Sequence, residues 1–143
     1  MSDEKEGDPN VVFYIRLVIK HPTLDPKLIT ETLQLTPHLA ASEGMQRYTP
    51  KGRLSGIFRE TVWSYSEEHR GHHHFMADLE RLVGSIESHA KFLSDITSSG
   101  GTISLLLDLS GADNVGDVIG WPLLTRLASL RIDLGAEVFP GLR

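Results

Sequence analysis

The densest group of side chains that could do chemistry lies in residues 67–74, where four histidines fall within six positions. Imidazole is a common ligand for zinc, nickel and copper, so this segment is a candidate site for a divalent metal ion. In a helix, His69 and His73 would lie one turn apart and could chelate one ion. Glu68 and His72 have the same spacing. The metal ligands that this pattern predicts are His69, His72 and His73.

The same segment has a second interpretation, in which it is a solvated polar linker that binds no ion. Gly71 interrupts any helix there, and the order of residues is not the His-Glu-x-x-His of a metalloprotease. The expectation for cofactors is therefore none, with a divalent metal ion as the alternative.

The two tryptophans are candidate anchors for a ligand or a partner protein. Trp63 and Trp121 each lie next to residues typical of turns or loops, and an indole ring contributes strongly to binding surfaces. The alternative is that both rings close the edges of the hydrophobic core.

Composition excludes several functional classes. The chain has no cysteine, which rules out disulfides, thiolate metal sites and cysteine nucleophiles. Its net charge of −5 argues against binding to nucleic acid or to a membrane surface. The stretch Lys51-Gly52-Arg53 begins like an RNA-binding motif but lacks the aromatic residues that stack on bases. No apolar run reaches the roughly 18–20 residues that a membrane span needs, and the start does not resemble a secretory signal, so we expect a cytoplasmic protein.

The 143 residues fit one folded domain. We expect a disordered, polar arm at residues 1–10 and a single α+β domain at residues 11–143. Residues 11–20 predict a strand because apolar residues alternate from Val11 to Ile19. Asp25 and Pro26 predict the start of a helix over residues 26–34 that buries Leu28, Ile29 and Leu33.

The middle of the chain predicts a hairpin followed by a long helix. Two strands are expected at residues 39–48 and 54–64, joined by a turn at 49–52. A linker over residues 66–74 then leads into one amphipathic helix at residues 75–98, which would be roughly 36 Å long. Ser99-Gly100-Gly101 would follow its end.

The last third predicts a central strand, a loop, a helix and a final strand. These lie at residues 102–109, 110–120, 121–130 and 131–139. The final strand would turn four side chains inward: Ile132, Leu134, Ala136 and Val138.

The predicted order is β-α-β-β-α-β followed by α-β. The first six elements match a ferredoxin-like core, and the last two would form an additional C-terminal α-β unit. Such a protein has an antiparallel-rich sheet with its helices on one face. A different α+β sandwich is the alternative, because order along the chain does not determine strand order in space.

A resemblance to a bacterial family rests on the order and spacing of short motifs. They are Val12-Phe13-Tyr14-Ile15, Asp25-Pro26 with Ile29-Thr30 and Leu33, Leu35-Thr36-Pro37, Gly44, Trp63-Ser64, the long helix, the strand at 103–109 and residues 127–133. In these the chain resembles the domain of unknown function 4279 family over most of residues 11–139. Leu134 stands where such families end in an aromatic residue. The resemblance implies neither an activity nor a functional residue.

The sheet face without helices is the candidate surface for a partner. Strict alternation places on it Tyr14, Arg16, Ser104, Asp108, Asp133 and Glu137. We expect Arg16 to pair with Asp108 or Asp133. The apolar residues that share this face favour a homodimer or a protein partner. The predicted function is a non-enzymatic binding module. The alternatives are a metal or small-ligand binder that uses residues 67–74 and a small enzyme that uses carboxylates near the 110–120 loop.

Overall fold

The computed structural model describes residues 11–48 and 54–140. Within them the chain forms α+β architecture around a five-stranded mixed sheet. The elements are β1 (Val11–His21), α1 (Pro26–Leu33), β2 (Leu39–Ala41), β3 (Gln46–Tyr48), β4 (Leu54–Ile57), β5 (Thr61–Arg70), α2 (Met76–Glu87), α3 (Ala90–Ser98), β6 (Thr102–Ser110), α4 (Trp121–Ser129) and β7 (Ile132–Phe139). The arm expected at residues 1–10 and the turn at 49–52 lie outside the described residues.

Strand β1 is the centre of a sheet with the order β2-β5-β1-β6-β7. Its predicted alternation is confirmed, because Val11, Phe13, Ile15, Leu17 and Ile19 are all fully buried. Strands β5 and β6 flank β1 in antiparallel register. β2 continues the antiparallel pairing at one edge, whereas β7 runs parallel to β6 at the other. Parallel neighbours need a long connection between them, and the segment that contains α4 provides it between β6 and β7.

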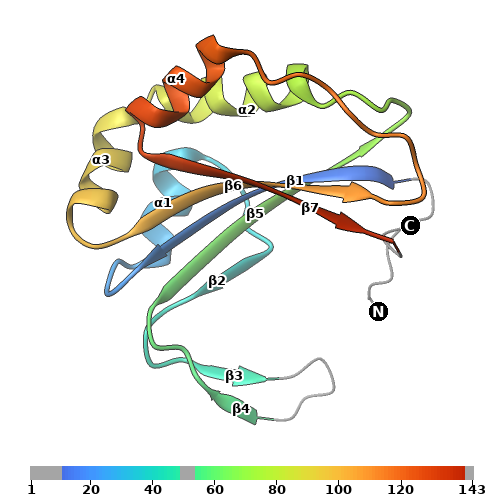
Figure 1. Cartoon of the computed structure of the whole chain (residues 1–143). Helices are drawn as coiled ribbons and strands as arrows, with labels where there is room; N and C mark the ends of the chain where they lie inside the picture. Colours follow the sequence, from blue (N-terminus) through green and yellow to red (C-terminus); the bar gives the residue numbers. More distant parts are fainter. Residues whose placement is uncertain (1–10, 49–53, 141–143) are drawn as a thin grey trace.

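The four helices lie on one side of the sheet (Figure 1). The buried side chains of all four helices join those of the sheet in one hydrophobic cluster. The hairpin of β3 and β4 extends away from the other side. The core therefore lies between the helices and one sheet face, and none of the described helices covers the opposite face.

Helix α1 begins as its sequence predicts. The Asp25 carboxylate accepts a hydrogen bond from the Lys27 backbone N–H at 3.0 Å, and Pro26 occupies the first turn. Gln34 ends the helix in the left-handed conformation, with φ of 58°. The prediction that Leu28 points inward is wrong, since this side chain is exposed whereas Ile29 and Leu33 are buried.

The single long helix is also wrong, because the chain breaks at Ser88 and His89 into α2 and α3. Serine hydroxyls compete for helical carbonyls just before this break. Ser85 donates to the Leu82 carbonyl at 2.8 Å, and Ser88 donates to the Ser85 carbonyl at 3.2 Å. The apolar stripe hides the break because its three- and four-residue spacing continues across it.

The strand limits in the middle of the chain also differ from the prediction. The segment expected at residues 39–48 forms two short strands, and residues 54–64 divide between β4 and β5. The polar linker expected at residues 66–74 is strand as far as Arg70, because β5 pairs with β1 along its length. Backbone pairing with the central strand outweighs the weak strand propensity of glutamate and histidine.

Candidate functional site

The uncovered sheet face brings together most of the side chains predicted to lie there. In the register of β1 and β6, Tyr14 lies opposite Asp108 and Val18 lies opposite Ser104. In the register of β6 and β7, Ser104 lies opposite Asp133 and Asp108 opposite Glu137. We call the surface formed by these residues and Arg16 the open face.

An ion pair crosses the open face. Arg16 donates from Nε to Asp108 Oδ2 at 2.5 Å and from its terminal nitrogen to Asp108 Oδ1 at 3.1 Å. The same guanidinium lies 3.7 Å from Glu137 Oε1. The Asp108 side chain is only 9% exposed and that of Arg16 28%. Of the two partners expected for Arg16, the structure therefore selects Asp108, which it holds in a two-pronged contact.

The two aspartates of the open face, Asp108 and Asp133, do not lie side by side. Asp108 lies opposite Glu137, whereas Asp133 lies opposite Ser104. These register positions are four residues apart, which corresponds to roughly 13 Å along a strand. Asp108 and Asp133 are therefore too distant to act on one substrate atom.

A buried hydroxyl on the open face has no hydrogen-bond partner. Ser64 lies between Val18 and Leu39 in the sheet register, and its Oγ finds no partner among the described residues. The Ser64 carbonyl accepts from the His38 backbone N–H at 2.9 Å. Burial, followed by the positive charge of Arg16, lowers the pKa of His38. An uncompensated polar atom at this position costs free energy of folding.

The two tryptophans do not lie on the open face. Trp63 is fully buried on the helix side of the sheet, where its indole N–H donates to Thr30 Oγ1 at 3.0 Å. Trp121 is 76% exposed at the first residue of α4, near the exposed Val118 and Leu124. Trp63 is thus part of the core, and Trp121 is separated from the open face by the sheet (Figure 1).

The histidine segment adopts a strand and a turn, so its side chains are arranged differently from the helical pattern. Glu67 and His69 lie on β5 opposite Ile15 and Phe13, facing the helices. Gly71 turns the chain with φ of +81°, a conformation that favours glycine. His72 follows in the turn, and Asp78 lies in the first turn of α2.

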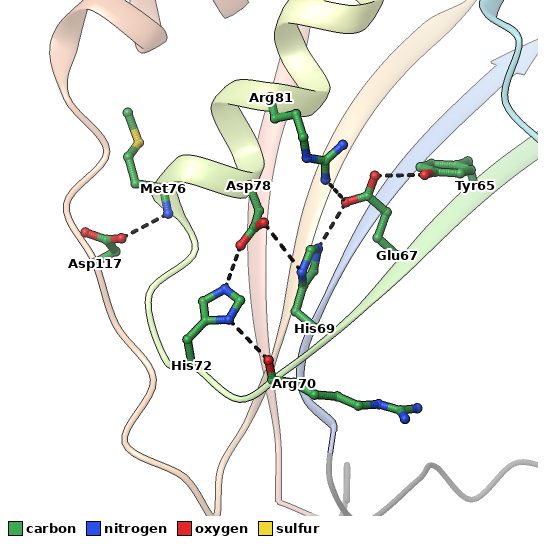
Figure 2. A network of polar contacts seen from close by, with 9 residues as sticks. All are labelled: Tyr65, Glu67, His69, Arg70, His72, Met76, Asp78, Arg81 and Asp117. Carbon is green, nitrogen blue, oxygen red and sulfur yellow. Dashed lines mark hydrogen bonds and ion pairs between the residues drawn. The ribbon is translucent and has the colours of Figure 1, made fainter.

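Figure 2 shows His69 and His72 pointing toward the Asp78 carboxylate. His72 Nε2 lies 2.7 Å from Asp78 Oδ2, and His69 Nδ1 lies 3.6 Å from Asp78 Oδ1. One ligand atom from each of these three residues falls within 4.8 Å of the others. His73 is not part of this group, which Asp78 completes, and the assignment of His73 as a metal ligand stays a prediction.

The second ring nitrogen of each histidine also has a partner. His69 Nε2 lies 3.0 Å from Glu67 Oε1, and His72 Nδ1 lies 3.2 Å from the Arg70 carbonyl. The Phe13 ring stacks on His69 with centroids 4.8 Å apart. Both imidazoles are therefore held in a defined orientation.

Glu67 is the centre of a second set of contacts in Figure 2. It accepts hydrogen bonds from Arg81 at 2.5 Å and from Tyr65 at 2.8 Å, in addition to its contact with His69. Burial opposes ionisation of Glu67, but these hydrogen bonds outweigh it and lower the pKa of the carboxyl group. The hydrogen bond to Asp78 raises the pKa of His72.

The start of α2 is fixed by a residue that sequence reasoning did not identify. Asp117, in the loop before α4, accepts a hydrogen bond from the Met76 backbone N–H at 2.9 Å. The same loop is attached to the histidine segment, since Gly116 N–H donates to the His73 carbonyl and the Gly116 carbonyl lies 2.8 Å from His74 Nδ1. The spacing of 41 residues between Met76 and Asp117 leaves no local signal for this cap.

The Tyr65 hydroxyl should ionise later than an ordinary tyrosine. Burial, followed by the hydrogen bond to Glu67, raises the pKa of Tyr65 to about 12, above the usual value of about 10. Because the folded pKa is the higher one, this contribution to stability is complete below pH ~10 and is lost as the pH rises toward 12. Phenolate absorbance should show a late titration step that is absent in Tyr65→Phe. If Tyr65→Phe instead loses an ordinary step near pH ~10 and no late one, the assignment is contradicted.

Comparisons with known proteins do not identify the chain. A scan against family models matches none, and searches of curated proteins and of solved structures find no similar one. The resemblance to the domain of unknown function 4279 family therefore stays a prediction. Among the described residues, no helix combines the length and the apolar character needed to span a membrane.

Proposed function

We propose that this protein is a non-enzymatic binding module that acts through the open face, and that its partner there is a second copy of the chain. The observation that carries the proposal is the apolar surface of the open face, which no described helix covers and on which Leu39 is 40% exposed. Val18 and Leu106 on the same face are only half-buried. Association would remove this apolar surface from water.

The distribution of charge on the open face favours a second copy as the occupant. Arg16 and Lys20 supply positive charge from the central strand, whereas Asp133 and Glu137 supply exposed negative charge from the edge strand. A two-fold axis through such a face places the central strand of one copy against the edge strand of the other. Opposite charges would then meet twice in an isologous interface.

Two further statements belong to the same proposal. We place the protein in the cytoplasm, and we assign the sheet to a ferredoxin-like core extended by α4 and β7. The order β2-β5-β1-β6 with antiparallel neighbours supports this core. An experimental structure in which β1 lies at an edge of the sheet would contradict the assignment.

Replacing Leu39 by aspartate should weaken the homodimer. Leu39 lies on the open face at the β2 edge and is 40% exposed, so the new carboxylate would be buried in the interface but solvated in the monomer. We expect the dimer dissociation constant to rise about tenfold or more. Sedimentation equilibrium of the wild-type and variant chains measures this change.

The matched control is Leu28→Asp on α1. Leu28 is 46% exposed, close to the value for Leu39, but α1 lies on the other side of the sheet. This variant should dimerise like the wild type. A monomeric wild-type chain at all concentrations, or equal weakening by both variants, would refute the homodimer.

A further inference from the structure

We propose that His69, His72 and Asp78 form a site for one divalent transition-metal ion, and that zinc is the ion this set of donors fits best. The site lies on the helix side of the sheet, so it is separate from the open face. Its ligands come from three consecutive structural units: the end of β5, the turn after it and the first turn of α2.

The first argument is distance. The three candidate ligand atoms already lie within 4.8 Å of one another. Two ligands at about 2.1 Å from a tetrahedral zinc ion are about 3.4 Å apart. Closing the remaining gap of roughly 1.4 Å requires side-chain rotation, and the His72 side chain, which is 44% exposed, has room for it.

The second argument is the direction of the lone pairs. Glu67 Oε1 and the Arg70 carbonyl can only accept hydrogen bonds, so His69 Nε2 and His72 Nδ1 carry the hydrogens in these contacts. In the neutral imidazoles, the nitrogens that face Asp78 then present lone pairs. Without an ion, His72 Nε2 instead shares a hydrogen with Asp78 Oδ2 at 2.7 Å, and a bound ion would displace this hydrogen and accept the electron pairs of all three groups. A positive ion placed at this point satisfies all three.

The third argument is the rigidity of the ligands. A carboxylate behind a histidine is the usual arrangement at zinc sites, where it selects the tautomer and orients the ring. Glu67 has this position behind His69, and Arg81 and Tyr65 hold Glu67 in place. Phe13 packs against the imidazole, and the hydrogen bond from Met76 to Asp117 fixes the helix that carries Asp78. The ligands are thus oriented before an ion arrives, which reduces the entropy lost on binding.

The identity of the donors selects the class of ion. Magnesium and calcium prefer sites made of oxygen atoms, whereas two imidazoles and one carboxylate suit zinc and its neighbours in the transition series. Three protein ligands would leave the fourth position of a tetrahedral zinc ion to water.

Isothermal titration of zinc chloride into chain without an affinity tag, purified without a nickel column and treated with a chelator, tests the proposal. We expect one ion per chain and no detectable binding of magnesium. His69→Gln, His72→Gln and Asp78→Asn should each weaken zinc binding about 100-fold or more. Glu67→Gln should weaken it by roughly 10- to 100-fold, because it alters the orientation of His69 but removes no ligand.

The matched control is His73→Gln, which makes the same substitution at an exposed histidine outside the group. Its zinc affinity should stay within about twofold of the wild type. Circular dichroism establishes that each variant is folded, and a cobalt-substituted wild-type chain should show the visible absorption of tetrahedral coordination. The proposal is overturned if the wild type binds no zinc, or if His73→Gln weakens binding as much as His69→Gln, since the latter would indicate adventitious binding to a histidine-rich surface.

Discussion

Replacing Trp63 by alanine should lower the free energy of unfolding by about 3–5 kcal/mol. Trp63 is fully buried and is among the largest side chains of the core. It lies opposite Ile19 of the central strand, and its indole N–H donates to Thr30 Oγ1 of α1. The substitution would leave a cavity between β5 and α1 and would remove the hydrogen bond that joins them. Urea denaturation followed by circular dichroism measures the change.

Trp121→Ala provides the matched control because it removes the same side chain from an exposed position. Trp121 is exposed over three quarters of its surface at the start of α4. Its replacement should change the free energy of unfolding by no more than about 0.5 kcal/mol. Equal losses of unfolding free energy from the two substitutions would contradict the assignment of Trp63, and not Trp121, to the core.

The parts of the fold that follow from short-range patterns could be predicted from the sequence. Alternation alone identifies β1 and its buried side chains, because a strand turns every second residue to the same face. Asp25 and Pro26 define the start of α1 because capping depends on neighbouring residues. The partner of Arg16 could be narrowed to two carboxylates for the same reason, since alternation determines the face but not the position along it.

The parts that depend on tertiary pairing could not be predicted. The extension of β5 to Arg70 requires β1 beside it, and this extension decides that His69 faces the helices. Treating residues 66–74 as a linker or a helix therefore placed His73 beside His69. Asp78 could not be recognised as a neighbour of His69 and His72, because it contacts His72 only after Gly71 reverses the chain and α2 begins.

The edge strand β7 shows that alternation alone does not predict which side chains are buried. By alternation, Ala136 and Val138 lie on the same sheet face as the buried Ile132, but both are exposed. Alternation predicts which face a side chain occupies, whereas burial also requires an element to cover it. The described helices do not extend over the end of β7.

Arg16→Leu should destabilise the chain by about 2–3 kcal/mol, because it leaves Asp108 nearly buried without its counter-charge. Breaking a fully buried ion pair by removing one partner costs about 3–5 kcal/mol, and the partial exposure of Arg16 reduces that penalty. Arg126→Leu is the control for geometry, since Arg126 also makes a two-pronged ion pair, but its partner Glu87 has a side chain that is 38% exposed, against 9% for Asp108. Its effect on urea denaturation should be clearly smaller.

The double variant Arg16→Leu, Asp108→Leu separates charge from packing. If the cost of the single substitution is the uncompensated Asp108 carboxylate, removing that carboxylate should restore most of the lost stability. A double variant as unstable as Arg16→Leu would instead assign the loss to the packing of the arginine side chain against the sheet.

Restored stability would also supply a folded chain whose open face lacks the charges of Arg16 and Asp108. In that chain the homodimer should dissociate more readily if opposite charges meet across the two-fold axis, because each copy would lack the Arg16 that faces its partner's edge strand.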